Sequence, residues 1–286
     1  MSESMPPSSF TRYCGNYVIS DLEQHRLSVA RISAFNDPFE LYFRPGKRLT
    51  RSAGRKTVRS RMRREGFWAM AASYFPGHTR KQLKRLVRGK MGQMISRHIE
   101  KQDALVEFQR SHSWETMEQY VRLMCFTEPK ENDPAEVPMW GYYGAKHEGV
   151  RIHIAKGFCE QVGSLIRVQY ESEPPELDLS LDPEGKDFYE FTGRVIRAKS
   201  CAWSHENEWR LMILIERCFK GSDANGLRRD FIKVSPEHIF RIDLGIRFDR
   251  NLLARADGLR TKFPQMEIYE TERHSHAYYP VYSKRV

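Results

Sequence analysis

The feature that most constrains the fold is a series of short strand-like segments in the second part of the chain. Each segment has alternating or continuous β-branched, aliphatic and aromatic residues, a pattern typical of β-strands. The segments are residues 120–127, 149–155, 164–170, 208–216, 231–234, 239–244 and 266–270. Helical patterns lie between some of them, at residues 21–26, 138–147, 156–162 and 250–263. Strands in runs with few helices between them predict an α+β fold with a mostly antiparallel, mixed sheet and flanking helices.

A basic segment precedes all of these strands. Between Lys47 and Arg110 the chain has 18 Lys and Arg residues and four acids, a local charge of +14 in a chain whose net charge is +10. Apolar residues recur at three- and four-residue spacing from Leu83 to Ile99, which predicts an amphipathic helix with a cationic opposite face. Residues 48–66 are expected to be flexible. We therefore expect an N-terminal part of the α+β core at 1–46, a basic helical insert at 47–115 and the remainder of the core at 116–286.

The cationic face of the insert indicates a polyanionic partner. Ordinary exposed helices mix acids and bases, whereas an excess of positive charge attracts phosphates. We expect nucleic acid or another polyanion to bind at Lys81, Lys84, Arg85 and Arg88. No recognisable DNA-reading motif accompanies these residues, so DNA, RNA and an acidic protein all stay open as partners. A solvated charged face packed on the core is the alternative interpretation.

Composition excludes several classes of protein. An aromatic content of 12% is too high for a disordered chain, and no apolar run approaches the roughly 20 residues that a membrane span needs. The N-terminus lacks the basic start and apolar core of a signal peptide. The five cysteines are odd in number and widely spaced, without a Cys-x-x-Cys pair, which argues against a disulfide framework and a zinc site. We expect a cytoplasmic protein with reduced thiols, no membrane contact and no metal.

The segment Asn36-Asp37-Pro38-Phe39-Glu40 has the signature of a helix start. Asp37 would be the N-cap, Pro38 the first helical residue and Glu40 the reciprocal partner of a capping box. The same helix start would expose backbone N–H groups that can receive a phosphate.

A second predicted helix, after Pro138, would carry Trp140, Tyr143 and His147 along one face. Gly149 then suits the left-handed position that ends a helix, and a strand follows. Trp140 and Tyr143 are either core aromatics or rings for a ligand, and His147 fits a capping or solvated role better than a catalytic one.

The residues around Glu206 give the sharpest chemical signal. If a strand already runs at Glu206, its alternation places Glu206, Glu208 and Arg210 on one face and the apolar side chains on the other. Two explanations are open. The three charges form a cross-strand ion-pair cluster, or they need a ligand as partner beside a buried sheet.

Four blocks of residues resemble the bacterial domain of unknown function 2971 family. They occur in order over residues 12 to about 280, apart from the basic insert. The blocks are Asn36-Asp37-Pro38-Phe39-Glu40, then Cys125-Phe126-Thr127-Glu128, then Met139-Trp140 with Tyr143, His147 and Gly149, then Lys199 with residues 203–210.

A more distant resemblance, to ADP-ribosyltransferases, implies a reaction. Glu206-Asn207-Glu208 resembles their Glu-x-Glu motif, whose second acid engages the nicotinamide ribose of NAD and supports an oxocarbenium-like transition state. The resemblance implies that Glu208 is catalytic and that Glu206 positions the acceptor or the ribose. Thr127 would stand where those enzymes have a Ser or Thr, and either Arg12 or Tyr13 where their first strand has an Arg or His.

The remaining cofactor contacts follow from the same resemblance. Trp140 or Tyr143 would sandwich the nicotinamide, and Arg12 or the helix start at Asp37-Pro38 would receive the pyrophosphate. Asn36, next to this helix start, is also expected to contact the cofactor.

Three classes of function result. The first is an NAD-dependent ADP-ribosyltransferase-like enzyme, a toxin or antiphage effector acting on nucleic acid or on a nucleic-acid-bound target. The second is a metal-dependent nuclease in which Asp37, Glu40, Glu206 and Glu208 bind the metal. The third is a non-catalytic nucleic-acid-binding module. The sequence assigns no antitoxin or other operon partner.

Overall fold

The computed structural model describes residues 6–35, 37–46, 50–100, 115, 117–178 and 186–285. The chain forms two compact units. The first, which we call the core unit, consists of Met1–Asp37, Thr116–Tyr170 and Cys201–Val286. The second, the insert unit, consists of Pro38–Glu115 and Glu171–Ser200. The insert unit therefore takes in residues 38–46 and 171–200 in addition to the basic segment.

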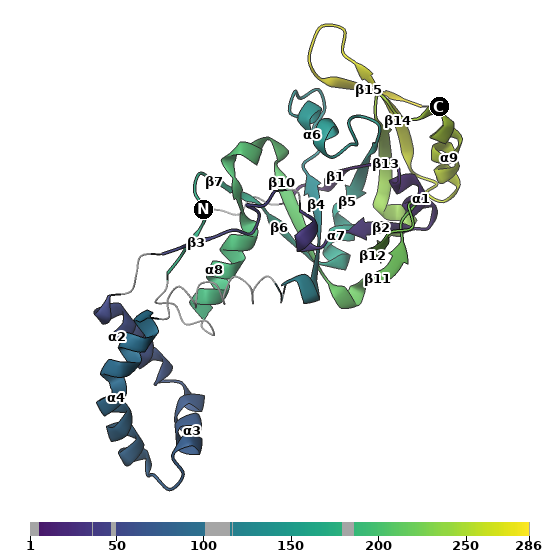
Figure 1. Cartoon of the computed structure of the whole chain (residues 1–286). Helices are drawn as coiled ribbons and strands as arrows, with labels where there is room; N and C mark the ends of the chain where they lie inside the picture. Colours follow the sequence, from purple (N-terminus) through teal and green to yellow (C-terminus); the bar gives the residue numbers. More distant parts are fainter. Residues whose placement is uncertain are drawn as a thin grey trace. The chain divides into compact units, whose positions relative to one another are not determined.

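An eight-stranded sheet forms the centre of the core unit (Figure 1). Its strand order is β15-β14-β13-β5-β1-β4-β10-β6, with β13 and β14 parallel and the other pairs antiparallel. The strands are β1 (Ser9–Cys14), β4 (Val121–Thr127), β5 (Val150–Ala155), β6 (Ser164–Arg167), β10 (Glu208–Leu214), β13 (Ile239–Leu244), β14 (Glu267–Arg273) and β15 (Pro280–Lys284). The predicted α+β class with a mostly antiparallel, mixed sheet is confirmed.

Strands β1 and β4, in the middle of this sheet, meet at a single pair of residues, Thr11 and Thr127. By contrast, β1 pairs with β5 over its whole length. Further along β4, the backbone of Leu123 exchanges two hydrogen bonds with Ala30, at 2.8 and 2.9 Å. Thr127 is therefore where the two halves of the sheet are joined.

The two faces of the sheet differ in character. One face carries the large apolar cluster, which includes Phe10, Met124, Ile152 and Leu211. Because side chains alternate along a strand, the residues between these apolar positions point to the other face, which is rich in buried polar side chains. The candidate site is on this polar face.

Short helices and a second sheet complete the core unit. The helices are α1 (Val18–Glu23), α6 (Glu136–Tyr142), α7 (Lys156–Val162) and α9 (Leu253–Gly258). A three-stranded sheet has the order β11-β12-β2 and consists of β2 (Arg26–Val29), β11 (Phe219–Ser222) and β12 (Arg228–Lys233). Strand β7 (Gln169–Glu171) crosses the boundary between the units. No helix in the described part of the chain is long and apolar enough to cross a membrane.

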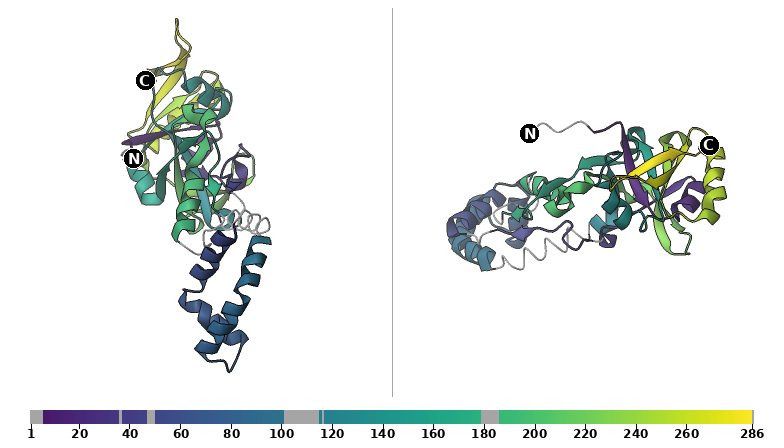
Figure 2. Two further views of the ribbon diagram at one scale, coloured as in Figure 1. Left: turned by 90° about the vertical axis from the view of Figure 1, so that its left-hand side faces the viewer. Right: turned by 90° about the horizontal axis from the view of Figure 1, so that it is seen from above.

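The insert unit is mainly helical. Its elements are α2 (Arg51–Arg61), α3 (Glu65–Tyr74), α4 (Arg80–Glu100), α8 (Lys186–Arg197), β3 (Arg44–Pro45), β8 (Glu176–Leu177) and β9 (Ala198–Ser200). Helices α2 and α4 lie side by side in both views of Figure 2. They approach closely because α2 has Gly54 at the contact, where an added Cβ would lie 3.3 Å from Ile95. The predicted amphipathic helix is confirmed as α4, with Leu83 and Val87 buried.

Three local predictions were wrong. No helix follows Asp37, because residues 38–41 form turns with Leu41 at φ 56°, and Glu40 forms an ion pair with the buried Lys199 at 3.0 Å. Residues 51–61 are not a flexible stretch but helix α2, whose N-cap Thr50 accepts a hydrogen bond from the Ala53 N–H at 3.2 Å.

The third wrong prediction concerns the end of α6. The left-handed residues there are Ala145, Lys146 and His147, with φ of 49°, 55° and 70°, and not Gly149. A glycine is needed at 149 for a different reason, since an added Cβ would lie 2.0 Å from the Cys14 carbonyl oxygen.

Candidate functional site

The segment Glu206-Asn207-Glu208 forms a tight connection between a 3-10 helix and a strand. The 3-10 helix, Cys201–Glu206, ends at the first acid, and β10 begins at the second. Asn207 between them has φ 45°, a left-handed conformation that Asn tolerates better than most residues. The strand does not reach Glu206, so the turn at Asn207, and not strand alternation, sets how the two acids lie.

Glu206 is buried and is held from two sides. Its Oε1 atom accepts a hydrogen bond from the Tyr143 hydroxyl at 2.7 Å, at the end of α6. Its backbone carbonyl accepts a hydrogen bond from the Thr127 hydroxyl, at the end of β4. The structure therefore brings together three residues that were predicted for one site, namely Thr127, Tyr143 and Glu206.

Glu208 joins this group through the strand register, which places it opposite Thr127. Its Oε1 atom accepts a hydrogen bond from Arg210 Nε at 2.8 Å, and the two side chains are 4% and 0% exposed. Its backbone N–H donates to the Tyr170 hydroxyl at 2.8 Å. The Phe35 ring centroid lies 5.8 Å from the Arg210 guanidinium. Glu208 and Arg210 share one face, as predicted, and a buried pair of this kind fixes the carboxylate in place.

Aromatic rings surround the Glu206 end of the site. The Tyr142 and Trp203 rings are 5.9 Å apart, and the Trp203 and His205 rings are 6.2 Å apart. Tyr142 is 65% exposed. His205 Nε2 is buried and has no hydrogen-bond partner among the residues that the structure describes. Sequence reasoning had not assigned these three residues to the site, although His205 directly precedes Glu206 and Trp203 lies two residues before His205.

Alternation along β1 distinguishes Arg12 from Tyr13. The Thr11 hydroxyl donates to the Thr127 carbonyl at 3.3 Å, which places Thr11 and Tyr13 on the face of the candidate site. Arg12 points to the opposite face, where its NH1 donates to the Ser28 carbonyl at 2.7 Å. Of the two candidates, Tyr13 therefore shares a face with Thr127 and Glu208.

The other predicted cofactor residues lie in different surroundings. Trp140 is fully buried, with its ring 5.1 Å from Tyr13 and its Nε1 donating to the Tyr282 hydroxyl at 3.3 Å, so it packs α6 onto the sheet. Asp37 is half-buried ahead of the turns at 38–41. Asn36 lies outside the described residues.

A buried charge cluster centred on Asp243 supports α6 on the same face. Its Oδ2 accepts hydrogen bonds from Arg151 Nε and His153 Nε2, and its Oδ1 from Arg241 Nε, each at 2.6 Å. Arg151 also pairs with Glu136 in the first turn of α6.

The protonation of this cluster follows from its charges. Burial alone raises the pKa of Asp243, but Arg151, the hydrogen bond from His153 and Arg241 lower it below its ordinary value. Burial lowers the pKa of His153, so we assign a neutral imidazole that donates its Nε2 proton to Asp243.

The four residues predicted to bind polyanions all lie exposed on α4, spaced so that they share one side of the helix. They are Lys81, Lys84, Arg85 and Arg88. None of the four forms an ion pair with a residue that the structure describes. Helix α4 as a whole carries seven Lys and Arg residues and one acid, Glu100.

Within the described ranges, no group of three or more His, Cys, Asp or Glu side chains is placed to hold a metal ion. Of the four carboxylates considered for a nuclease, Glu40 is paired with Lys199 and Glu208 with Arg210.

Comparisons with known proteins found no matching family model, no similar curated protein and no similar solved structure.

Proposed function

We propose that this protein is an enzyme that cleaves NAD and transfers its ADP-ribose group to an acceptor. The observation that carries the proposal is the Glu206-Asn207-Glu208 turn, which holds two buried carboxylates beside Thr127 at the junction of the sheet. NAD supplies an N-glycosidic bond that breaks with its electron pair leaving on nicotinamide, while the ribose carbon bonds to an acceptor nucleophile that loses a proton. A fixed carboxylate stabilises the positive charge that develops on the ribose more than it stabilises the ground state.

Each residue of the turn has a part in this proposal. Glu208, held by Arg210 at 2.8 Å, provides the fixed negative charge without having to reorganise during the reaction. Glu206, oriented by the Tyr143 hydroxyl, positions the ribose or the acceptor.

The surroundings of Glu206 fit a nicotinamide group. The Tyr142 and Trp203 rings offer apolar surface for a flat ring. His205 Nε2, which has no hydrogen-bond partner in the described part of the chain, suits a carboxamide. Trp140, which is fully buried, is not part of this surface. Such an enzyme would work in the cytoplasm, where its five free cysteines stay reduced.

We propose nucleic acid, or a protein bound to it, as the acceptor. The support is the exposed cationic side of α4, which has no acidic partner among the described residues, because a surface of one sign attracts the phosphate backbone. This role fits a toxin or an antiphage effector of the domain of unknown function 2971 type. Binding without catalysis is the second candidate function, and it rests on the same α4 surface.

The test is nicotinamide release from NAD by the full chain, measured by chromatography with RNA, DNA or no acceptor. We expect Glu208→Gln to lower turnover by about a hundredfold or more with little change in KM, because the variant keeps the shape of the side chain but loses its charge. The variant should also melt at a lower temperature, because it removes the charge that pairs with the buried Arg210. Tyr143→Phe leaves the Glu208 ion pair intact, and we expect it to lower turnover about tenfold because it removes the hydrogen bond that orients the Glu206 carboxylate.

The matched control is Glu237→Gln, an exposed glutamate of the same unit, which should keep full activity. Circular dichroism of each variant separates lost chemistry from lost folding. Wild-type protein that releases no nicotinamide under any of these conditions, or a folded Glu208→Gln variant with full turnover, contradicts the proposal.

A further inference from the structure

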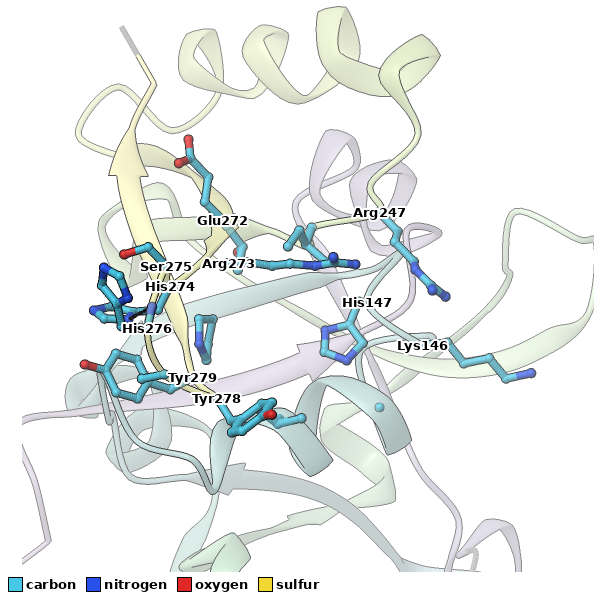
Figure 3. A pocket seen from close by; sticks show the side chains of 16 residues that line it. Lys146, His147, Arg247, Glu272, Arg273, His274, Ser275, His276, Tyr278 and Tyr279 are labelled. Carbon is cyan, nitrogen blue, oxygen red and sulfur yellow. Dashed lines mark hydrogen bonds between the residues drawn. The ribbon is translucent and has the colours of Figure 1, made fainter.

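A cavity of about 780 Å³ opens on the core unit, apart from the Glu206 turn. Three loops line it: the one after α6 with His147, the one after β13 with Arg247, and the loop that joins β14 to β15 (Figure 3). Small-molecule sites have volumes in this range.

The cavity is cationic. Lys146, Arg247 and Arg273 line it and are exposed, and within the described part of the chain none of the three has an acidic partner. Glu272 also lines it, but its Oε1 accepts a hydrogen bond from Ser283 at 3.2 Å, and Figure 3 shows its carboxylate pointing away from Arg273. Many other arginines in this unit form ion pairs with acids, and Arg250, for example, is paired with Glu270 at 3.1 Å. Arg12, Arg217, Arg228 and Arg260 form no ion pair with a residue that the structure describes. Two arginines left open at one cavity indicate an anionic ligand.

A strained turn presents His147 to this cavity. Ala145, Lys146 and His147 are all left-handed, which disfavours each non-glycine residue, and backbone hydrogen bonds hold the turn. The His147 N–H donates to the Trp140 carbonyl at 3.2 Å, and the His147 carbonyl accepts from the Arg247 N–H at 2.9 Å. Burial and the charge of Arg247 lower the pKa of His147, so a neutral ring with one N–H faces the cavity at neutral pH.

The β14–β15 loop adds aromatic surface. Tyr278 is 95% exposed, and the His274 and Tyr279 rings are 4.6 Å apart. Thr271, also in the lining, has a buried hydroxyl without a partner among the described residues. In Figure 3 the Arg273 side chain extends from the hairpin towards His147 and Arg247, while Tyr278 and Tyr279 lie on the hairpin side. The cationic groups and the aromatic rings therefore occupy different parts of the lining.

We propose that this cavity binds a nucleoside monophosphate. Arg247, Arg273 and His147 bind the phosphate, since two guanidinium groups and an imidazole N–H supply several donors to its oxygens. The rings of the β14–β15 loop stack on the base. The site does not depend on the NAD chemistry proposed at Glu208.

The test is calorimetry of the full chain with each of the four ribonucleoside 5′-monophosphates, with the matching nucleosides and with inorganic phosphate. We expect at least one monophosphate to bind more than tenfold tighter than both its nucleoside and inorganic phosphate. The double variant Arg247→Ala, Arg273→Ala should weaken that binding tenfold or more.

The matched control is Arg250→Ala, Arg255→Ala, which removes two exposed arginines of the same unit that pair with Glu270 and Glu23 outside the cavity. It should leave the affinity unchanged. The proposal is overturned if no monophosphate binds, if inorganic phosphate binds equally well, or if the affinity survives the loss of Arg247 and Arg273.

Discussion

Replacing Asp243 by Asn should destabilise the core unit strongly. Both carboxylate oxygens of Asp243 accept hydrogen bonds, two at Oδ2 and one at Oδ1, and the side chain is fully buried. An Asn has one oxygen and one NH₂ group, so at least one of Arg151, His153 and Arg241 would face a donor instead of an acceptor. Removing one partner of a buried ion pair costs about 3–5 kcal/mol. For a unit of 150–250 residues this corresponds to a fall in Tm of about 6–20 °C.

The assay is urea and thermal unfolding followed by circular dichroism, with Asp249→Asn as the matched control. Asp249 is exposed and caps a short helix by accepting from the Asn251 N–H at 2.9 Å, a role that Asn fills about as well. An Asp243→Asn protein within about 1 kcal/mol of wild type would refute the reasoning, since it would show that the cluster tolerates a missing charge.

The same residue predicts a pH dependence. Because the folded pKa of Asp243 is below its unfolded value, its contribution is present above the unfolded pKa, near 3.9, and is lost as the pH falls towards the folded pKa. The variant lacks this contribution, so the stability difference between wild type and Asp243→Asn should shrink on acidification below about pH 4. A difference that stays constant down to pH 2 would contradict the assigned ionisation.

Two further predictions concern the insert unit and a glycine. Neutralising Lys84 and Arg85 should weaken RNA binding, measured by fluorescence anisotropy. The slope of log Kd against log salt should fall by about one for each phosphate that the helix no longer neutralises. The control is Lys262→Gln, and a slope equal to that of the control would count against α4 as the binding surface. Gly149→Ala should lower the Tm by several degrees because its Cβ would lie 2.0 Å from the Cys14 carbonyl oxygen, whereas Gly157→Ala, with open space around its Cβ, should be neutral or slightly stabilising. Equal melting of the two glycine variants would show that the backbone at 149 can move aside.

Hydrophobic periodicity in the sequence correctly predicted the elements that bury one side against a neighbour. In β10 the alternation of Trp209, Leu211 and Ile213 with Arg210 marked which face is apolar, and the structure has that arrangement. Helix α7 begins and ends at the residues that its pattern indicated, Lys156 and Val162. Both elements bury one side against a neighbour, so their sequence carries the periodicity of that contact.

Predictions failed where a distant residue decides the local structure. Glu40 has the spacing of a capping partner, but it pairs with Lys199, which no local pattern could reveal. The sequence made Tyr143 a candidate for the site, but it could not predict the hydrogen bond from the Tyr143 hydroxyl to Glu206, because that bond depends on where α6 packs. The sequence could not predict the cationic cavity, because its residues come from three separate loops and none of these loops has a recognisable motif.

The pairing of β1 also bears on how the chain folds as it is synthesised. Its partner β5 follows about 140 residues later. At a synthesis rate of about 5–20 residues per second, β1 would wait roughly 7–28 s on the ribosome before β5 is made. Its other neighbour, β4, leaves the ribosome earlier but meets β1 at a single pair of residues. During that interval Phe10 and Cys14 have no sheet to pack on, so the N-terminal strand is exposed to aggregation until β5 is made.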